Sequence, residues 1–240
     1  MAWVYNKCGG ARFQTTPDFR VEVEGHGFPM LEPGTTRYKI LQRTWKNWSY
    51  YIRKWSRIRT NECLKQRKDP SKPGCALLPP SNILAIMTQE TGHLSADKSK
   101  QAAAGSPAGA VGLMQIMPCS IFNASTEIGK LVCNSDRSSP NASVKIGSKL
   151  LQTQLGNQGG LPAAASNYNA GSLTCYKGVH EKNVFNWHHE QNYAYKVAEY
   201  NNTAIAMGVN DAYLPLWAWA LGGVAVTGGA LYLLKRAGRI

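Results

Sequence analysis

The chain has 240 residues, of which 43% are hydrophobic and 17% are charged. This composition supports one full domain with a packed core and excludes a chain that is disordered throughout. The net charge of +13 is uneven, with 15 Lys and Arg against 6 Asp and Glu in residues 1–80, 9 against 8 in residues 81–211, and 3 against none in residues 212–240. A nearly neutral module is therefore expected between two basic flanks.

Residues 1–36 are expected to be mostly irregular, because glycines and prolines interrupt any regular period. One short strand is predicted at Arg20–Glu24, where apolar and charged side chains alternate. The first 30 residues have no apolar core of the length that a secretory signal needs, so no export signal is expected.

A basic amphipathic helix is predicted at residues 37–59, followed by a proline-rich linker that ends at Pro80. Its apolar stripe recurs at steps of three and four and consists of Leu41, Trp45, Trp48, Ile52 and Trp55. Three interpretations stay open: the stripe packs on the domain core, the helix lies on a membrane surface, or it binds an anionic polymer.

A short helix is predicted at residues 81–90, with Ser81 as its cap and Glu90 as its last residue. The preceding run Ile83–Met87 is apolar, so the carboxyl group of Glu90 is expected at the end of a buried helix. Burial favours the neutral form of a carboxyl group and raises its pKa, which a general acid near neutral pH requires. The alternative is an ordinary glutamate at a helix end on the surface.

Two segments of the middle region carry polar side chains in apolar surroundings. In Gly109–Pro118 the only strongly polar side chain is that of Gln115, and an amide there needs partners that a sugar ligand can supply. The alanine-rich segment 161–171 ends with Tyr168 and Asn169, which offer a hydroxyl and an amide. The neighbouring segments are predicted to be loops at 95–109 and 123–141 and helices at 144–155 and 190–204.

Six cysteines are present, and Cys63/Cys75 and Cys119/Cys133 each bracket a loop-like segment. This arrangement favours two local disulfides and hence an oxidising space, while unpaired thiols in a reducing compartment are the alternative. No cysteine or histidine spacing matches a zinc site and no carboxylate cluster matches a metal site, so neither a metal nor a cofactor is expected.

Residues 212–234 form an uncharged run of 23 residues, which is long enough to cross a bilayer. Aromatic residues lie near both ends, and a basic tail, residues 235–240, follows at once. This pattern predicts a transmembrane helix with a cytoplasmic C-terminus. The alternative is a buried helix of a soluble domain.

Four ordered motifs resemble the soluble lytic transglycosylase family. They are Gln89-Glu90-Thr91-Gly92, Gly109-Ala110-Val111-Gly112-Leu113-Met114-Gln115-Ile116-Met117-Pro118, Ala165-Ser166-Asn167-Tyr168-Asn169-Ala170-Gly171 and Tyr193-Ala194-Tyr195-Lys196-Val197. The resemblance implies a mostly α, lysozyme-like domain. The expected organisation is an irregular segment 1–36, a helix and linker 37–80, the transglycosylase domain 81–208, and the transmembrane helix 212–234 with its tail 235–240.

By this resemblance Glu90 is the single catalytic acid and base. The substrate-binding residues that it implies are Thr91, Gln115, Met117, Tyr168, Asn169 and Tyr193. Glu90 would protonate the glycosidic oxygen between MurNAc and GlcNAc of peptidoglycan, then take the proton of the C6 hydroxyl as that oxygen closes on C1. The product is 1,6-anhydroMurNAc, formed without water. Most glycosidases use two carboxylates, yet between Glu90 and Glu127 the chain offers only Asp97.

A domain that cleaves the wall must reach the periplasm, and the expected lack of an export signal favours delivery by a bacteriophage particle. The expectation is a virion-associated, membrane-anchored enzyme that opens the wall locally during genome entry. Its expected partners are peptidoglycan strands, a lipid bilayer through residues 212–234, and other virion or envelope-channel proteins, whereas nucleic acid is not required. A hydrolytic goose-type lysozyme and a non-catalytic glycan-binding component of an entry or secretion conduit stay open as alternatives.

Overall fold

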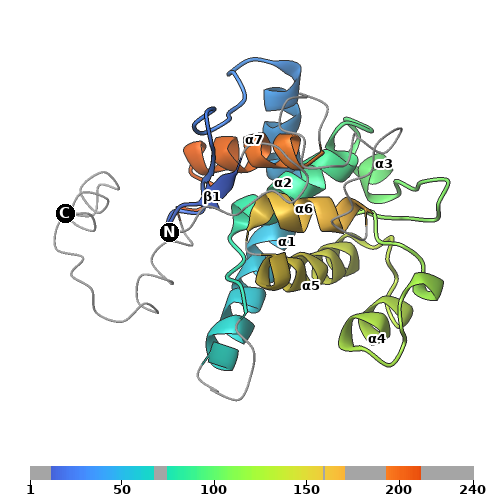
Figure 1. The fold of residues 1–240 in the computed structure, drawn as a ribbon. Helices are drawn as coiled ribbons and strands as arrows, with labels where there is room; N and C mark the ends of the chain where they lie inside the picture. The colour runs from blue at the N-terminus through green and yellow to red at the C-terminus, as the bar shows by residue number, and fades with distance from the viewer. Residues whose placement is uncertain (1–11, 68–74, 159, 171–192, 212–240) are drawn as a thin grey trace, which may run out of the picture. The chain divides into compact units, whose positions relative to one another are not determined.

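Figure 1 shows the computed structural model, which describes residues 12–67, 75–158, 160–170 and 193–211. Within these residues the chain is mostly helical, as the sequence predicts, and consistent with a lysozyme-like fold. The described residues up to Asn210 belong to one compact unit. The elements in chain order are β1 (Phe13–Thr15), β2 (Val21–Val23), α1 (Thr36–Arg67), α2 (Pro80–Met87), the π-helical turn η1 (Thr88–Gly92), α3 (Lys98–Ala102), the 3-10 turn η2 (Cys119–Ile121), α4 (Glu127–Cys133), α5 (Pro140–Gln158), α6 (Leu161–Ala170) and α7 (Tyr193–Ala206).

The tryptophan side of α1 packs inward. The buried apolar side chains on this side are Leu41, Trp48, Ile52 and Trp55. Trp48 Nε1 also donates a hydrogen bond to Gln101 Oε1 at 3.0 Å. Trp45 stays partly exposed, with the guanidinium carbon of Arg53 4.8 Å from its ring centroid. Of the three interpretations of this helix, the structure supports packing on the core.

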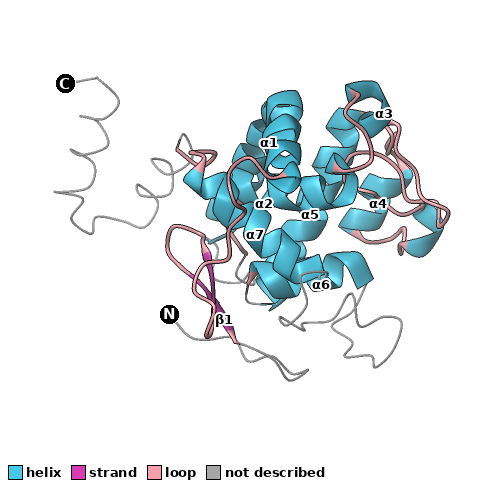
Figure 2. Cartoon of the chain, turned by 90° about the horizontal axis from the view of Figure 1, so that it is seen from above, coloured by secondary structure: helices cyan, strands magenta, loops and turns pink. Residues whose placement is uncertain are grey.

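A small hairpin precedes α1 and lies beside α7 (Figure 2). Its two strands pair antiparallel with Phe13 opposite Val23, and β2 confirms the strand predicted at Arg20–Glu24. The side chain of Asn202 in α7 bonds both backbone groups of Val21, accepting from its N–H at 2.7 Å and donating to its carbonyl oxygen at 2.8 Å. The amide thus takes the place of a neighbouring strand, so that the N–H and the carbonyl group of Val21 both keep a hydrogen-bond partner inside the protein.

All eight residues of α2 are buried, so the first turn of this helix has no access to water. The residue before it, Pro79, makes no side-chain cap, and Pro80 begins the helix. Asn210 supplies the missing partner: its Oδ1 accepts from the Ser81 N–H at 3.0 Å and its Nδ2 donates to Ser81 Oγ at 3.1 Å. The prediction that Ser81 caps its own helix is therefore wrong, because a distant residue satisfies the buried N–H.

Two segments predicted to be loops contain short helices, α3 within 95–109 and α4 within 123–141. Asp97 and Thr126 cap these helices, each accepting a hydrogen bond from the backbone N–H three residues further along. Both residue types are favoured at helix N-caps, so the start signals are present in the sequence. These helices have only one or two turns, and the polar and small residues around them show no apolar period, so the sequence predicts loops there.

Both local cysteine pairs form disulfides in the structure, Cys63–Cys75 and Cys119–Cys133. The first joins the last part of α1 to the segment before α2, and the second joins the start of η2 to the end of α4. Each bond spans a short stretch of chain and stabilises the fold by about 3 kcal/mol, mainly by restricting the unfolded chain. For these four cysteines the structure supports the paired alternative.

The predicted transmembrane helix requires a correction. Among the described residues no helix is both long enough and apolar enough to cross a membrane. The longest described helix, α1, has 32 residues and carries charged residues along its whole length. The segment that motivated the prediction, residues 212–234, lies outside the described residues. The fold class is therefore corrected to a mostly helical domain that is consistent with a lysozyme-like fold, and the transmembrane helix is withdrawn from it.

Candidate active site

Glu90 lies in η1, a single turn of π-helix that continues directly from α2. Such wide turns occur frequently at functional sites. The turn packs closely on α1 because Gly92 has no side chain: a Cβ there would lie 2.9 Å from Ile40 Cγ2. Arg43 of α1 also donates from Nη2 to the carbonyl oxygen of Gly92 at 3.0 Å. The position of the carboxyl group is thus determined by α1 as well as by α2.

The carboxyl group of Glu90 meets the hydroxyl of Tyr193, the first residue of α7. Tyr193 Oη donates to Glu90 Oε1 at 2.5 Å, and the tyrosine is buried. Burial raises the pKa of Glu90 to about 7, and the Tyr193 hydroxyl opposes part of this rise because it stabilises the carboxylate. The Glu90 side chain keeps a partly exposed surface, so a ligand can reach it. A carboxyl group that is partly protonated at neutral pH can act as both acid and base.

Thr91 is predicted from the sequence to bind substrate, but its side chain is buried. Its hydroxyl lies 2.9 Å from the carbonyl oxygen of Leu113 and 3.2 Å from that of Met87. A hydroxyl has a single hydrogen, so the two carbonyl groups share it. In the structure Thr91 therefore joins the turn that carries Glu90 to the loop that follows Val111.

Residues 111–116 form a tight loop, which two backbone hydrogen bonds between Val111 and Ile116 close. Gln115 has a φ of 47° within it, and its Nε2 donates to the carbonyl oxygens of Ala104 at 3.1 Å and Gly112 at 3.0 Å. Both amide hydrogens therefore hold the loop in shape, which corrects the expectation that a sugar satisfies them. The side-chain carbonyl oxygen of Gln115 is the atom that can accept from a sugar hydroxyl.

Tyr168 of α6 connects this loop to the carboxyl group. Its Oη donates to the carbonyl oxygen of Met114 at 2.8 Å. Burial, and then the negative charge of Glu90, raise the pKa of Tyr168 well above its usual value, so the two side chains lie within electrostatic reach and the phenol stays protonated. The other two predicted residues lie at the ends of their segments, Asn169 exposed and Met117 partly exposed. The structure therefore brings the hydroxyl groups of Tyr168 and Tyr193 close to the Glu90 carboxyl group.

Two side chains that the sequence does not single out form hydrogen bonds with the loop at 111–116. Arg137 Nη1 donates to the carbonyl oxygen of Ile116 at 2.8 Å, and Ser143 Oγ accepts from the Met114 N–H at 3.1 Å. Both residues come from the start of α5 and the segment before it. An arginine and a serine near a helix start are ordinary surface residues in a sequence, so no local pattern indicated this function.

No group of three Cys, His, Asp or Glu side chains that could hold a metal ion occurs within the described ranges. The ionisable side chain at the centre of the site is the Glu90 carboxyl group, and its nearest partner is a phenol. The site thus offers proton transfer by a carboxyl group.

Replacing Tyr193 with Phe should raise the pKa of Glu90 further above about 7, because the hydroxyl that stabilises the carboxylate is lost. Activity that requires the protonated acid declines as the pH rises through this pKa. The alkaline limb of kcat/KM should therefore move to higher pH, while kcat falls by about tenfold because the carboxyl group is held less firmly. Murein cleavage measured across a pH series checks both effects.

Tyr168→Phe is the matched control for this change. Its hydroxyl donates to a backbone carbonyl oxygen and not to the carboxyl group, so its removal should lower stability by about 1 kcal/mol without moving the alkaline limb. Equal pH profiles for Tyr193→Phe and the wild type would show that the Tyr193 hydroxyl does not tune Glu90.

Comparison with protein families gives one match. Residues 76–189 match the model described as the transglycosylase SLT domain. Comparison with curated proteins gives no match. The matched segment contains Glu90, the loop at 111–116 and Tyr168, and it ends shortly before Tyr193. Residues 76–189 are thus similar to the transglycosylase SLT domain, and this similarity supports an enzyme of the lytic transglycosylase kind that acts on peptidoglycan.

Proposed function

We propose that this enzyme cleaves the β-1,4 bond between MurNAc and GlcNAc and forms 1,6-anhydroMurNAc, with Glu90 as its single acid and base. The observation that carries the proposal is the Glu90 carboxyl group, whose pKa of about 7 suits both giving and taking a proton. Its hydrogen bond from Tyr193 orients one oxygen and leaves the other for the substrate.

In the first step the protonated Glu90 donates its proton to the glycosidic oxygen, and the bond from that oxygen to C1 of MurNAc breaks. The acetamido oxygen of the same sugar stabilises the positive charge that develops at C1. In the second step the Glu90 carboxylate takes the proton of the C6 hydroxyl as the C6 oxygen bonds to C1. The carboxyl group is thereby restored to its protonated form, and no water is consumed.

A one-carboxylate reaction is supported by the surroundings of Glu90. Its pKa shift arises from burial and from the Tyr193 hydroxyl, and no second carboxylate among the described residues contributes to it. Asp97, the next acidic residue in the sequence, caps α3 through the Lys100 N–H at 2.9 Å and is exposed. A two-carboxylate glycosidase needs its second group within about 5–9.5 Å of the first.

Mass spectrometry of digested murein tests the proposal. Purified sacculi treated with the full chain should release muropeptides that end in 1,6-anhydroMurNAc, each lighter by one water than the reducing-end product. Reducing-end products alone would identify a hydrolytic enzyme of the goose-type lysozyme kind. Glycan binding without any released product would identify a non-catalytic component of a conduit.

The site of action in this proposal is the periplasm or cell envelope, where peptidoglycan lies. Two disulfides support it, because disulfides persist in the periplasm and on virion surfaces but rarely in the cytosol. Delivery by a bacteriophage particle that opens the wall locally during genome entry is the finer part of the proposal. Antibody detection of the protein in purified particles supports it, and detection only in the cytoplasm of infected cells contradicts it.

A further inference from the structure

The side of α1 that faces away from the core carries a line of exposed cations. The tryptophan side of this helix packs inward, and Figure 2 shows α1 at one edge of the described unit, with α2, α5 and α7 all on one side of it. On the opposite side exposed cations recur at helical spacing, and we call them the basic face: Lys39, Lys46, Arg53, Lys54 and Arg57. At the rise of an α-helix the basic face extends over about 27 Å.

The basic face has no counter-charge within the described part of the chain. α1 contains ten Lys and Arg residues but one acidic residue, Glu62, and this carboxylate pairs with Arg59 at 2.7 Å. The other ion pairs among the described residues also include no cation of the basic face. Exposed cations that no carboxylate neutralises attract an anionic surface outside the protein.

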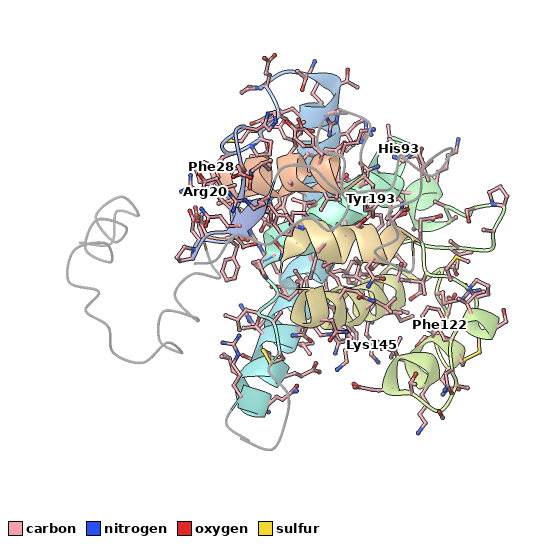
Figure 3. All side chains as sticks on the ribbon, in the orientation of Figure 1. Arg20, Phe28, His93, Phe122, Lys145 and Tyr193 are labelled. Carbon is pink, nitrogen blue, oxygen red and sulfur yellow. A yellow bond between two sulfur atoms is a disulfide. The ribbon has the colours of Figure 1, made fainter. Side chains whose placement is uncertain are left out.

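Cations of two neighbouring helices add to this charge. The ammonium nitrogen of Lys98, in α3, lies 4.9 Å from the centroid of the Trp48 ring. Lys145 of α5, which is labelled in Figure 3, has its ammonium nitrogen 5.8 Å from the centroid of the Trp55 ring. Lys54 of the basic face lies 5.4 Å from the same ring centroid. Positive charge from α3 and α5 therefore lies beside that of α1.

A large aromatic side chain lies in the middle of the basic face. Tyr50 comes four residues after Lys46 and three before Arg53, and it is 69% exposed. Its ring packs against that of Tyr51 edge to face, with 5.2 Å between the centroids. Tyrosine has an apolar ring and a polar tip, and it is enriched where a membrane meets water. Cations and aromatic rings on one helix face are typical of helices that lie on a membrane surface.

A membrane surface fits this arrangement, because a straight line of cations can bring all its charges to a plane at once. Anionic phospholipid headgroups form such a plane. Since α1 is already folded and packed on the core, binding requires no ordering of the helix. We infer that the basic face binds the anionic headgroups of a phospholipid bilayer, with α1 along the surface. This inference rests on the proposed function only for the place of action, since a membrane borders the space in which peptidoglycan lies.

A nucleic acid is the other common partner of a row of cations, because its phosphates are closely spaced. Two observations favour the membrane. The exposed ring of Tyr50 suits the boundary between headgroups and water. The two disulfides favour a space outside the cytosol, where membranes face the protein and free nucleic acid is scarce.

Sedimentation of the full chain with lipid vesicles tests the inference. One set of vesicles is phosphatidylcholine alone, and the other is phosphatidylcholine and phosphatidylglycerol in equal parts. Lys46→Gln/Arg57→Gln should bind the anionic vesicles about thirtyfold more weakly than the wild type at low salt, because each cation near such a surface contributes about fivefold in affinity. Binding of the wild type should weaken as the NaCl concentration rises, and both proteins should bind the neutral vesicles equally.

Lys100→Gln/Lys130→Gln is the matched control, because it lowers the net charge equally by removing exposed lysines from α3 and α4. It should bind the anionic vesicles as the wild type does, and so should Lys46→Arg/Arg57→Lys, which keeps both charges. All three variants should keep the thermal midpoint of the wild type, because the changed side chains are exposed. They should also cleave soluble murein strands at the wild-type rate.

Equal binding of the wild type and Lys46→Gln/Arg57→Gln to anionic vesicles would overturn the inference. An equal loss in Lys100→Gln/Lys130→Gln would do the same, because net charge and not the basic face would then determine binding. Binding of double-stranded DNA that depends on Lys46 and Arg57, without binding of anionic vesicles, would assign the basic face to a nucleic acid instead. Failure of the proposed function gives a different result: murein would release no anhydro product, whereas vesicle binding is measured without murein.

Discussion

Replacing Glu90 with Gln should reduce the rate of murein cleavage by about a thousandfold, which is the effect expected from loss of the only acid and base. Gln has nearly the same shape as Glu but carries no proton that it can transfer at neutral pH. Tyr193 can still donate to the amide oxygen of Gln, so the arrangement of α2, η1 and α7 is retained. Release of anhydro-muropeptides, followed by chromatography over time, measures the loss.

Asp97→Asn is the control for the Glu90 substitution. Asp97 is the acidic residue nearest to Glu90 in the sequence after it, and its Oδ1 caps α3. Asn can make the same cap, so the variant should fold normally and cleave murein at the wild-type rate. If Glu90→Gln releases anhydro-muropeptides as fast as the wild type, Glu90 is not the catalytic acid and base.

Glu90→Gln should also make the protein more stable at alkaline pH. The folded-state pKa of Glu90 is about 7 against 4.5 for an ordinary glutamate, so the folded protein holds this proton more tightly. Between these two values the unfolded chain loses its proton first, and the wild type becomes less stable as the pH rises. At pH 8 the variant should gain about 3 kcal/mol over the wild type, and at pH 4 almost nothing. Urea unfolding at both pH values provides the measurement.

Replacing Gly112 with Ala should destabilise the protein by about 3 kcal/mol and reduce activity with it. Gly112 has a φ of +79°, which L side chains rarely adopt, and a Cβ there would collide with the carbonyl oxygen of Arg137 and lie 2.7 Å from Ser143 Oγ. Relief of this collision requires movement of the loop at 111–116, which contains Gln115 and the carbonyl oxygen that Thr91 contacts. Urea unfolding and murein cleavage measure the two losses.

Two neighbouring glycines separate the effect of backbone strain from the effect of the steric collision. Gly109 has a φ of +83° but room for a Cβ, with no atom nearer than 3.5 Å, so Gly109→Ala should cost about 1 kcal/mol through backbone strain alone. A Cβ at Gly105 would be 3.7 Å from its nearest neighbour, and no positive φ is recorded there, so Gly105→Ala should be nearly neutral. A Gly112→Ala variant as stable as Gly105→Ala would show that the loop yields easily.

Local patterns predicted most of the helices, because apolar side chains at steps of three and four leave few other choices. The spacing predicts α1, α5 and α7 in this way, although α1 continues to Arg67 and α5 begins already at Pro140. The raised pKa of Glu90 followed from its place at the end of an apolar run. These predictions succeeded because each depends on residues that are close together in the chain.

What the sequence analysis missed depends on partners that are far apart in the chain. Asn210 satisfies the first turn of α2, and Arg137 holds the loop that ends at Ile116. The resemblance implies that Thr91 binds substrate, but it does not indicate that the Thr91 hydroxyl is buried and bonds the carbonyl oxygen of Leu113. A motif identifies residue types, but only the packing of separate elements decides whether a polar atom faces a ligand or the interior.

The hydrogen bonds from α7 to the N-terminal hairpin also affect the order in which the protein can be completed. Asn202 bonds Val21 across 181 residues, and Asn210 bonds Ser81 across 129. During synthesis β2 and α2 must therefore wait for their partners until almost the whole unit has left the ribosome. A recombinant fragment cut to residues 76–189 would lack α1, the hairpin and Tyr193. The matched family segment is thus shorter than the smallest piece of this chain expected to fold and cleave murein.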